Sequence, residues 1–348
     1  MLQIQSMKYG LIIPSLLLGL LTAAPLQAQP LQVCATVPEL GSLAREIGGD
    51  QVAVTVFAKG TEDAHFVVPK PSFIKALSEC SLYIQMGMDL EIGWIPPLLQ
   101  NARNRNILPG NRGYLDASIV ITPLEVPTVT VDRSMGDLHP LGNPHYLLDP
   151  MNGLRVARVI RNKLVELLPG SAQYFDQRYE DFRQRLGIAL VGQALYEKYD
   201  FEKLALLAER GRLVDFLKSQ GEESLLGGWL GLMQPYYGAP VVADHRMWPY
   251  FAELFGLKVV DHLEPLPGIP PTTQHLNTVI DLMKAQNVKA ILASAYYDPR
   301  YARFVSENTG AAVVNMAHQA GARPGTENYL DMVDYNVQRL AAALGGAA

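Results

Sequence analysis

The sequence predicts an α/β protein of two (β/α) lobes with mainly parallel sheets, joined by a long rigid helix, with a ligand site between the lobes. Three observations lead to this fold class. Short apolar strands alternate with helices in both halves of the chain, a long helical stretch lies between the halves, and histidines stand at several strand ends. The length of 348 residues also exceeds what one hydrophobic core usually supports, so two domains are expected.

The first half begins the alternation of strands and helices. Apolar or β-branched runs predict strands at 31–37, 52–57 and 82–86. Helices are predicted between them at 40–47 and 71–77. Strands that alternate with helices in this way are typical of a parallel sheet covered by helices.

Two helices are expected in the middle of the chain. Asp149 and Pro150 form a helix-start signal, and apolar residues then recur at helical spacing up to Leu167. A second helix of roughly 25 residues is predicted from Ser171 toward Lys198, which is long for a globular helix. We expect this helix to be a rigid spine. It divides the chain into an N-terminal lobe, a linking helix and a C-terminal lobe at 29–168, 169–198 and 199–348.

The second half restarts the alternation. Strands are predicted at 240–243, 258–260, 290–293 and 311–316. Helices are predicted at 249–255, 273–285, 301–308 and 329–344. The stretch 198–234 belongs to neither pattern and is expected to be an inserted helical segment, broken at Gly227 and Gly228.

The start of the chain, 1–28, has the pattern of a secretory signal peptide. Lys8 supplies a positive charge, 11–21 is almost wholly apolar, and small residues lead to a cleavage site after Ala28. The apolar run is shorter than the ~20 residues of a membrane span, although an N-terminal anchor helix is the alternative. A periplasmic location is therefore expected.

Charge and cysteine content limit the partners. The formal net charge is −5 and no long basic run occurs, so nucleic acid is not expected as a partner. The protein is expected to be a monomer. Cys34 and Cys80 lack the spacing of a metal-binding pair, and in an oxidising compartment they either form a disulfide or remain two buried thiols.

Four of the seven histidines stand where strands or connecting segments are expected to reach one edge of a sheet. They are His65, His145, His245 and His318. The carboxyl ends of parallel strands form the crevice in which open α/β folds bind ligands. Two of the four fall in each half, so a site between the lobes can collect them. Neutral imidazole is a zinc ligand, and we expect a zinc site whose affinity falls below about pH 6.5.

Other residues near these positions are candidates for supporting roles. His139 is either a further ligand or a loop residue that delivers metal, whereas His262 and His275 are expected to be structural. A ligating imidazole needs a hydrogen-bond partner on its other nitrogen. The carboxylates nearest in sequence are Glu62, Asp63, Asp149 and Asp244.

Four stretches of the chain resemble the solute-binding proteins of ABC transporters for zinc and manganese. They are 62–77 (EDAH, then KPSFIKAL), 143–150 (NPHYLLDP), 244–257 (from DH to FGL) and 329–337 (YLDMVDYNV). They occur in the order of the family's motifs. The resemblance implies two (β/α) lobes joined by a long helix, a divalent metal ion bound between them, and delivery to an ABC transporter permease in the inner membrane, without enzymatic activity.

The resemblance also implies a ligand set. The family's three histidine positions fall on His65, His145 and His245. The family often has an Asp at the fourth position, where this chain has His318; water, Glu62 and His139 are the alternative fourth donors. A fourth imidazole favours Zn²⁺, with Mn²⁺ as the second choice, because carboxylate suits manganese.

The chain departs from the family in two segments. Many zinc-specific members carry a histidine-rich acidic loop, whereas 128–141 contains only His139. The predicted helical segment at 198–234 is larger than the family leads us to expect.

Three alternatives to a periplasmic metal-binding transport protein stay open at this point. A zinc hydrolase would use three histidines with an open fourth position and Glu62 as general base, but no HExxH spacing occurs. A periplasmic metallochaperone or an adhesin would share the fold and differ in its partner. A two-lobed protein for an organic ligand would use aromatic residues near the crevice, namely Trp94, Trp248, Tyr296 and Tyr297.

Overall fold

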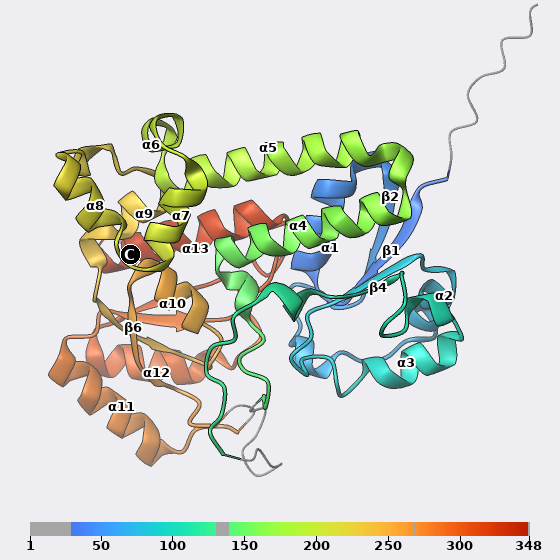
Figure 1. The fold of residues 1–348 in the computed structure, drawn as a ribbon. Coiled ribbons are helices and arrows are strands. Elements are labelled where there is room, and N and C mark those ends of the chain that lie inside the picture. The colour runs from blue at the N-terminus through green and yellow to red at the C-terminus, as the bar shows by residue number, and fades with distance from the viewer. Residues whose placement is uncertain (1–28, 130–138, 267–268, 347–348) are drawn as a thin grey trace, which may run out of the picture.

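Two lobes stand side by side, each built on a four-stranded parallel sheet (Figure 1). The computed structural model describes residues 29–129, 139–266 and 269–346, so the predicted signal peptide lies outside the described residues. Among the helices of these ranges, none combines the length and the apolarity needed to cross a bilayer.

The N-terminal sheet has the strand order β2-β1-β3-β4. Its strands are β1 (Leu31–Ala35), β2 (Val52–Val56), β3 (Leu82–Gln85) and β4 (Tyr114–Asp116). Its helices are α1 (Pro38–Gly48), α2 (Pro71–Glu79) and α3 (Ile95–Ala102). The sequence did not predict β4, which is too short to show a pattern. It also did not predict α3, which contains two prolines. Both prolines stand in the first turn of that helix, where a missing N–H costs nothing.

The C-terminal sheet repeats this topology, with the order β6-β5-β7-β8. Its strands are β5 (Pro240–Ala243), β6 (Lys258–His262), β7 (Ala290–Ala293) and β8 (Ala312–Asn315). Its helices are α10 (Pro249–Phe255), α11 (Thr273–Gln286), α12 (Pro299–Thr309) and α13 (Tyr329–Leu344). The predicted strands and helices of this half are confirmed, with shifts of one or two residues at their ends.

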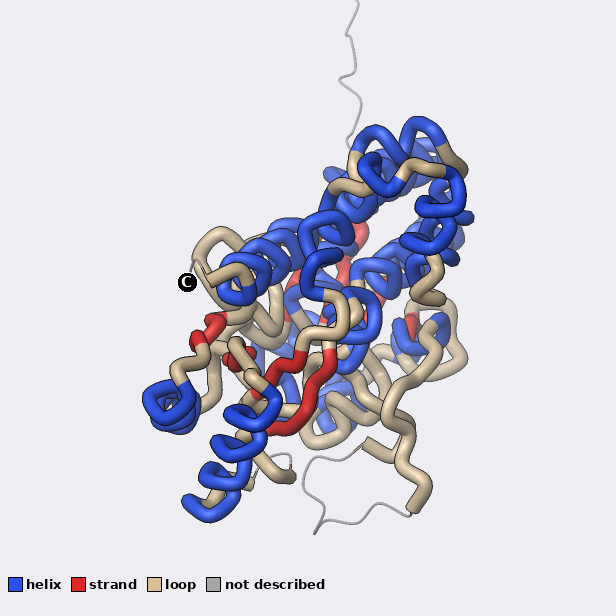
Figure 2. The backbone as a smooth tube through the Cα atoms, turned by 90° about the vertical axis from the view of Figure 1, so that its left-hand side faces the viewer, coloured by secondary structure: helices blue, strands red, loops and turns tan. Residues whose placement is uncertain are grey.

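Helices cover both faces of the C-terminal sheet, and Figure 2 shows helices on both sides of the strands. Leu292 of β7 packs into the main core, whereas its neighbour Ile291 packs on the opposite face against Val279 of α11 and Val305 of α12. Because both faces are buried, the strands are apolar throughout rather than alternating with polar residues.

Two long helices, α4 (Pro150–Leu167) and α5 (Ala172–Val191), pack against each other and run between the lobes (Figure 1). The predicted linking helix ends earlier than expected. Gly192 has φ +86°, and a Cβ there would lie 2.8 Å from the Gly227 Cα, so the chain turns before α6 (Gln193–Lys198) begins. The division of the chain at residues 168 and 198 remains a prediction.

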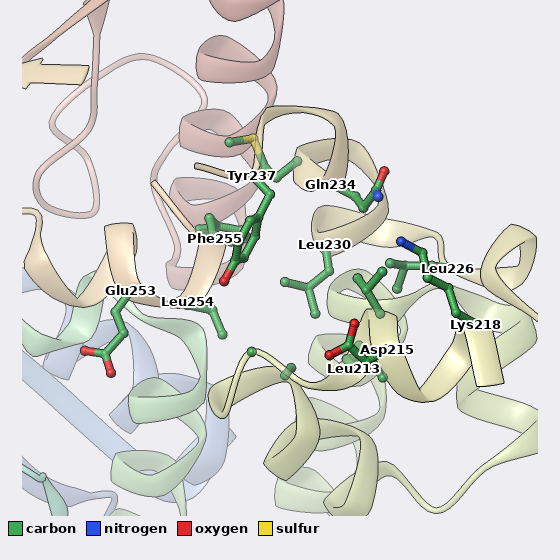
Figure 3. Close-up of a pocket in the computed structure, with 14 residues that line it drawn as sticks. Leu213, Asp215, Lys218, Leu226, Leu230, Gln234, Tyr237, Glu253, Leu254 and Phe255 are labelled. Atoms are coloured by element: carbon green, nitrogen blue, oxygen red, sulfur yellow. The ribbon is translucent and has the colours of Figure 1, made fainter. Parts of the chain in front are cut away.

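The stretch after α6 is helical, as predicted. It contains α7 (Phe201–Glu209), α8 (Leu213–Gln220) and α9 (Gly228–Met233), and the expected break at Gly227 and Gly228 falls at the start of α9. Together with α10, these helices enclose a cavity of about 380 Å³ (Figure 3). The side chains that line this cavity are mainly apolar, and they do not include a histidine.

The two cysteines lie in the N-terminal sheet region as predicted, Cys34 within β1 and Cys80 just before β3. Both are buried free thiols in the structure, which therefore contains two thiols rather than a disulfide.

The first residue of α13 attaches the end of the chain to the N-terminal lobe. Tyr329 is only 1% exposed, its backbone N–H donates to Ser42 Oγ at 2.9 Å, and its hydroxyl donates to the Leu147 carbonyl at 2.8 Å. Gly153 of α4 lies against the Tyr329 ring. These contacts hold the segment just before α4, which carries His145.

We expect Gly153→Ala to destabilise the protein, because the new Cβ would lie 2.1 Å from the Tyr329 hydroxyl oxygen. Overpacking of this kind costs about 1–3 kcal/mol, so the midpoint of urea unfolding should fall while its slope stays constant. Gly170→Ala is the matched control, since nothing lies within 4 Å of its Cβ position. Equal stability of the two variants would show that the Tyr329 ring is not held in place.

Candidate metal centre

The candidate site lies where the strand ends of the two lobes face each other. His245 follows β5, and His65 lies in a short 3-10 turn at 64–66 in the connection from β2 to α2. His145 directly precedes the turn 146–148 that leads into α4. These positions agree with those expected from the sequence, and they bring residues from both lobes to one crevice.

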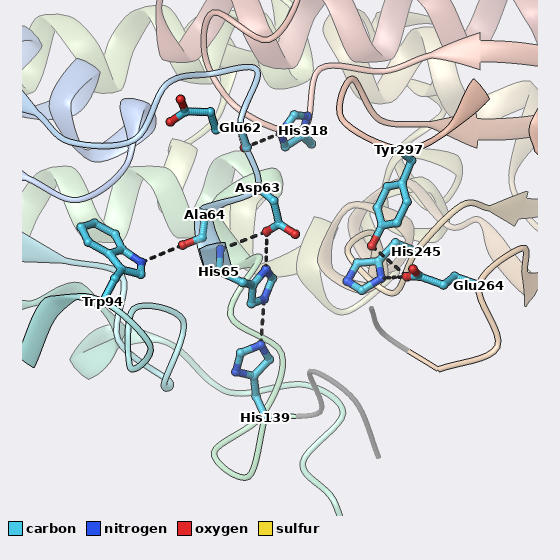
Figure 4. A network of polar contacts seen from close by, with 10 residues as sticks. All are labelled: Glu62, Asp63, Ala64, His65, Trp94, His139, His245, Glu264, Tyr297 and His318. Atoms are coloured by element: carbon cyan, nitrogen blue, oxygen red, sulfur yellow. Dashed lines mark hydrogen bonds and ion pairs between the residues drawn. The ribbon is translucent and has the colours of Figure 1, made fainter. Parts of the chain in front are cut away.

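Four imidazole rings gather in this crevice. The ring centroid of His65 lies 5.3 Å from that of His145 and 6.3 Å from that of His245, and the latter two are 6.0 Å apart. His139 stacks on His65 with the centroids 5.0 Å apart and the two Nε2 atoms at 2.9 Å (Figure 4). Three of the four histidines named from the sequence therefore come together, and His139 joins them.

Asp63 orients the ring of His65. Its Oδ1 lies 2.6 Å from His65 Nδ1 and accepts the backbone N–H of the same residue at 2.9 Å (Figure 4). Burial by itself raises the pKa of Asp63, but the hydrogen bonds from His65 outweigh it and leave this pKa below its usual value. The ionised carboxylate accepts from Nδ1–H, which leaves Nε2 of His65 free to bind a cation.

Glu264 does the same for His245 in the other lobe. Glu264 Oε2 lies 2.7 Å from His245 Nδ1, and the Tyr297 hydroxyl donates to the same oxygen at 2.8 Å (Figure 4). His245 and Glu264 are 4% and 7% exposed, so water competes little for this hydrogen bond. The Nε2 atom of His245 is again the nitrogen left for a cation.

His145 and His139 have a different environment, since no carboxylate of the described ranges hydrogen-bonds to either ring. Burial, followed by the neighbouring histidines, lowers the pKa of His145 well below its usual range. The same causes, burial first, lower the pKa of His139 to about 3. A buried imidazole that stays neutral at physiological pH keeps a lone pair for a metal ion.

His318 lies beside the cluster rather than within it. Its Nε2 is 3.4 Å from the carbonyl oxygen of Glu62, and its ring lies edge-on to Tyr296 with the centroids 4.7 Å apart. Its Nδ1 is buried and has no hydrogen-bond partner among the described residues.

The cluster is somewhat wider than a tetrahedral zinc site. Zn–N bonds of about 2.0–2.1 Å place the centroids of two tetrahedral imidazole ligands about 5 Å apart. His65 and His139 have this separation, whereas the distances to His245 are about 1 Å longer. Accordingly, no three His, Cys, Asp or Glu side chains within the described ranges are placed to hold one ion.

Of the carboxylates nearest in sequence, only Asp63 supports a clustered histidine. Asp149 caps α4 by accepting the Met151 N–H at 2.7 Å. The side chain of Asp244 accepts the backbone N–H of Ser294 at 2.6 Å. These two residues therefore support the fold rather than a ligand.

The sequence did not indicate Glu264, because it stands 19 residues after His245. The parallel pairing of β5 with β6 brings the two together, and the Glu264 N–H donates to the Asp244 carbonyl at 3.0 Å. The sequence signal that could have indicated Glu264 was an acidic residue just after the strand next to β5. This signal becomes informative only once the strand order is known.

The two remaining histidines lie away from the cluster, around the end of β6. Nε2 of His275 donates to the His262 carbonyl at 2.8 Å and thereby links α11 to β6. Burial, together with the charge of Arg246, lowers the pKa of His262 to about 3.

Known proteins with the same architecture match most of the chain. The profile of the family described as "Zinc-uptake complex component A periplasmic" matches residues 33–189 and 232–343. The unmatched stretch, 190–231, contains α6, α7 and α8. The departure expected at 198–234 largely coincides with this unmatched stretch.

Relatives and solved structures are similar to this chain at low identity. The manganese-binding lipoprotein MntA of Halalkalibacterium halodurans is 22% identical over 323 residues, which cover 90% of this chain and 88% of that protein. The iron-binding protein YfeA of Yersinia pestis is 23% identical over 321 residues, covering 91% and 88%. The crystal structure of ZnuA has a TM-score of 0.65 at 23% identity, covering 90% of this chain and 99% of its own. The Mn-bound periplasmic metal binding protein from Candidatus Liberibacter asiaticus has a TM-score of 0.62 at 18% identity, covering 90% and 98%.

We expect Glu264→Gln to weaken metal binding about 10- to 100-fold, because a neutral amide holds the Nδ1–H form of His245 less firmly. Asp63→Asn should act in the same way on His65. Competition with a chelating indicator measures both effects. Glu307→Gln, which changes an exposed carboxylate of α12, is the control. An unchanged affinity in Glu264→Gln would mean that this carboxylate does not orient a ligand.

The stability of the metal-free protein should fall as the pH drops from about 6.5 toward 4. His262 stays neutral in the folded state down to about pH 3, whereas the unfolded chain binds a proton near pH 6.5, so acid favours the unfolded state. Each such histidine adds up to about 1.4 kcal/mol per pH unit to the slope. Urea unfolding at several pH values should show a smaller slope for His262→Gln, and an identical slope would contradict the neutral folded form.

Proposed function

We propose a cargo and a ligand set for this chain, which belongs to the family of the periplasmic zinc-uptake complex component A. Proteins of this family are the substrate-binding components of metal ABC importers and are not enzymes. The chain is accordingly a divalent-metal-binding transport protein that delivers its ion to a permease. We propose that its cargo is Zn²⁺ and that His65, His145 and His245 bind the ion together with a fourth donor.

The choice of zinc rests on the donor atoms that meet in the crevice. Four imidazoles form the centre of the cluster, and the carboxylates of Asp63 and Glu264 stand behind the rings. Imidazole ligands suit zinc, whereas manganese prefers carboxylate oxygens. The relatives named for manganese or iron share fewer than a quarter of their residues with this chain, so the donor set is the better guide to its metal.

The candidates for the fourth donor are His318, as expected from the sequence, and His139, with water or Glu62 as the remaining alternatives. The position of His139 favours it, because its Nε2 already lies 2.9 Å from Nε2 of His65. Two nitrogen ligands of a tetrahedral zinc ion lie about 3.3 Å apart, so little movement is needed. His318 is supported by its buried Nδ1, which has no partner in the described part of the chain.

The family and the pattern at the start of the chain both support an extracytoplasmic location. Family members are extracytoplasmic solute-binding proteins. We propose that residues 1–28 are a signal peptide, that cleavage follows Ala28, and that the mature protein acts in the periplasm as a monomer. The cognate permease would then lie in the inner membrane.

The test is a competition titration of the metal-stripped mature protein, residues 29–348, with Zn²⁺ and Mn²⁺ against a chelating indicator. We expect one tight equivalent of zinc, weaker binding of manganese, and loss of zinc binding in the combined variant His65→Ala, His145→Ala and His245→Ala. Tighter manganese than zinc would contradict the cargo. Tight zinc binding that persists in the combined variant would contradict the ligand set.

Two single variants identify the fourth donor in the same assay. His139→Ala should weaken zinc binding more than His318→Ala does, because only His139 is already in place beside His65. The reverse order would assign the fourth position to His318. If neither change weakens binding, water or Glu62 completes the site.

A further inference from the structure

The connection from β3 to α3 contains a left-handed turn of three residues. Gly87, Met88 and Asp89 have φ angles of +79°, +51° and +63°. A side chain makes this region of backbone conformation unfavourable, and no other two neighbouring non-glycine residues of the described ranges adopt it. Such a conformation persists only where the surrounding structure holds it, and it is found most often at functional sites.

A buried carboxylate holds this turn in place. Glu91 is only 3% exposed, and its Oε1 accepts the Met86 N–H at 2.7 Å and the Thr36 hydroxyl at 2.6 Å. Its Oε2 accepts the N–H of Gly87 at 3.2 Å. Thr36 directly follows β1 and Met86 directly follows β3, so the donors are fixed by the ends of two adjacent strands. An ionised carboxylate only accepts, and it can therefore satisfy all three donors at once.

The turn presents a backbone carbonyl to His139. The carbonyl oxygen of Met88 accepts a hydrogen bond from the His139 ring. The Nε2 atom of this ring faces Nε2 of His65 at 2.9 Å (Figure 4), so the nitrogen that donates to Met88 is Nδ1. Because a carbonyl cannot donate, Nδ1 carries the hydrogen and Nε2 keeps its lone pair.

The two facing Nε2 atoms then have no hydrogen between them. Asp63 selects the Nδ1–H form of His65, and Met88 selects the same form of His139. Two lone pairs at 2.9 Å repel each other unless a cation binds to both, and two nitrogen ligands of tetrahedral zinc lie about 3.3 Å apart. The orientation of both rings is therefore the one that a shared metal ion needs.

We propose that Glu91 is a positioning residue for His139. By holding the turn 87–89, Glu91 fixes the Met88 carbonyl, which selects the Nδ1–H form of His139 and directs its Nε2 toward the ion. The proposal rests on the proposed function in one respect, the choice of His139 as the fourth donor. It gives His139 the kind of partner that Asp63 provides for His65, with a backbone carbonyl in place of a carboxylate.

The first experiment determines the tautomer of His139 in the metal-free mature protein, by NMR of nitrogen-labelled histidine. It is done at about pH 8, because burial raises the pKa of Glu91 to about 7. We expect the Nδ1–H form in the parent and a shift toward the Nε2–H form in Glu91→Gln, since an amide NH₂ cannot accept from the turn. His139→Ala identifies the signal. An Nε2–H form in the parent, or an Nδ1–H form that Glu91→Gln leaves unchanged, would overturn the proposal.

The second experiment compares the zinc affinities of the parent, Glu91→Gln, His139→Ala and the combined variant by competition with a chelating indicator. We expect Glu91→Gln to weaken binding about 10-fold, the lower end for groups that orient a ligand. In the His139→Ala background the same change should alter affinity by less than about twofold. Equal losses in both backgrounds would overturn the proposal, since Glu91 would then act through the fold as a whole. Glu79→Gln, which changes an exposed carboxylate at the end of α2, is the matched control and should bind zinc as the parent does.

Thr36→Val keeps the shape of the side chain and removes one donor to Glu91, so it tests the proposal even if Glu91→Gln does not fold. We expect a smaller loss of zinc affinity than in Glu91→Gln, again only when His139 is present. An unchanged affinity in Thr36→Val would overturn the proposal. Because the first experiment contains no metal, its outcome is independent of the cargo. A protein in which Glu91 controls the His139 tautomer but which binds no zinc would overturn the proposed function and leave the positioning role standing.

Discussion

Two carboxylate–imidazole hydrogen bonds, one in each lobe, are the interactions on which the arrangement of the crevice depends. Asp63 orients His65, and Glu264 orients His245, at Nδ1 distances of 2.6 and 2.7 Å. Each carboxylate selects the Nδ1–H form of its histidine, so both Nε2 atoms are left as electron-pair donors. The two orienting groups belong to different lobes, so the donors converge only when the lobes face each other.

The charge balance of the crevice is consistent with a divalent cargo. Burial favours neutral His139 and His145, as their lowered pKa values indicate. The carboxylates of Asp63 and Glu264 then place two negative charges behind the rings. A divalent cation at the centre of the histidines would neutralise them, whereas a monovalent ion would leave one buried negative charge without compensation.

The two halves of this site are held in place by contacts that lie at some distance from the histidines. The helices α4 and α5 run between the lobes, and Tyr329 at the start of α13 attaches the C-terminal end of the chain to the segment that carries His145. The segment 190–231, which the family profile does not match, packs on α10 and encloses its own cavity away from the histidines. This segment therefore lies apart from the histidine cluster, and its cavity does not include any of the clustered histidines.

The sequence by itself determined the fold class, most helix and strand positions, the location of His65 and His245 after strands, and that of His145 just before the α4 helix start, because periodicity and breaker residues act over a few neighbours. It also placed Asp63 among four carboxylates near the histidines, and the structure shows which of the four orients a ring. Only the tertiary structure decided that His139 joins the cluster, that His318 stands beside it, and that Glu264 orients His245. Those relations depend on which strands are adjacent and on how a connecting segment folds back, and local sequence patterns do not encode distances between residues far apart in the chain.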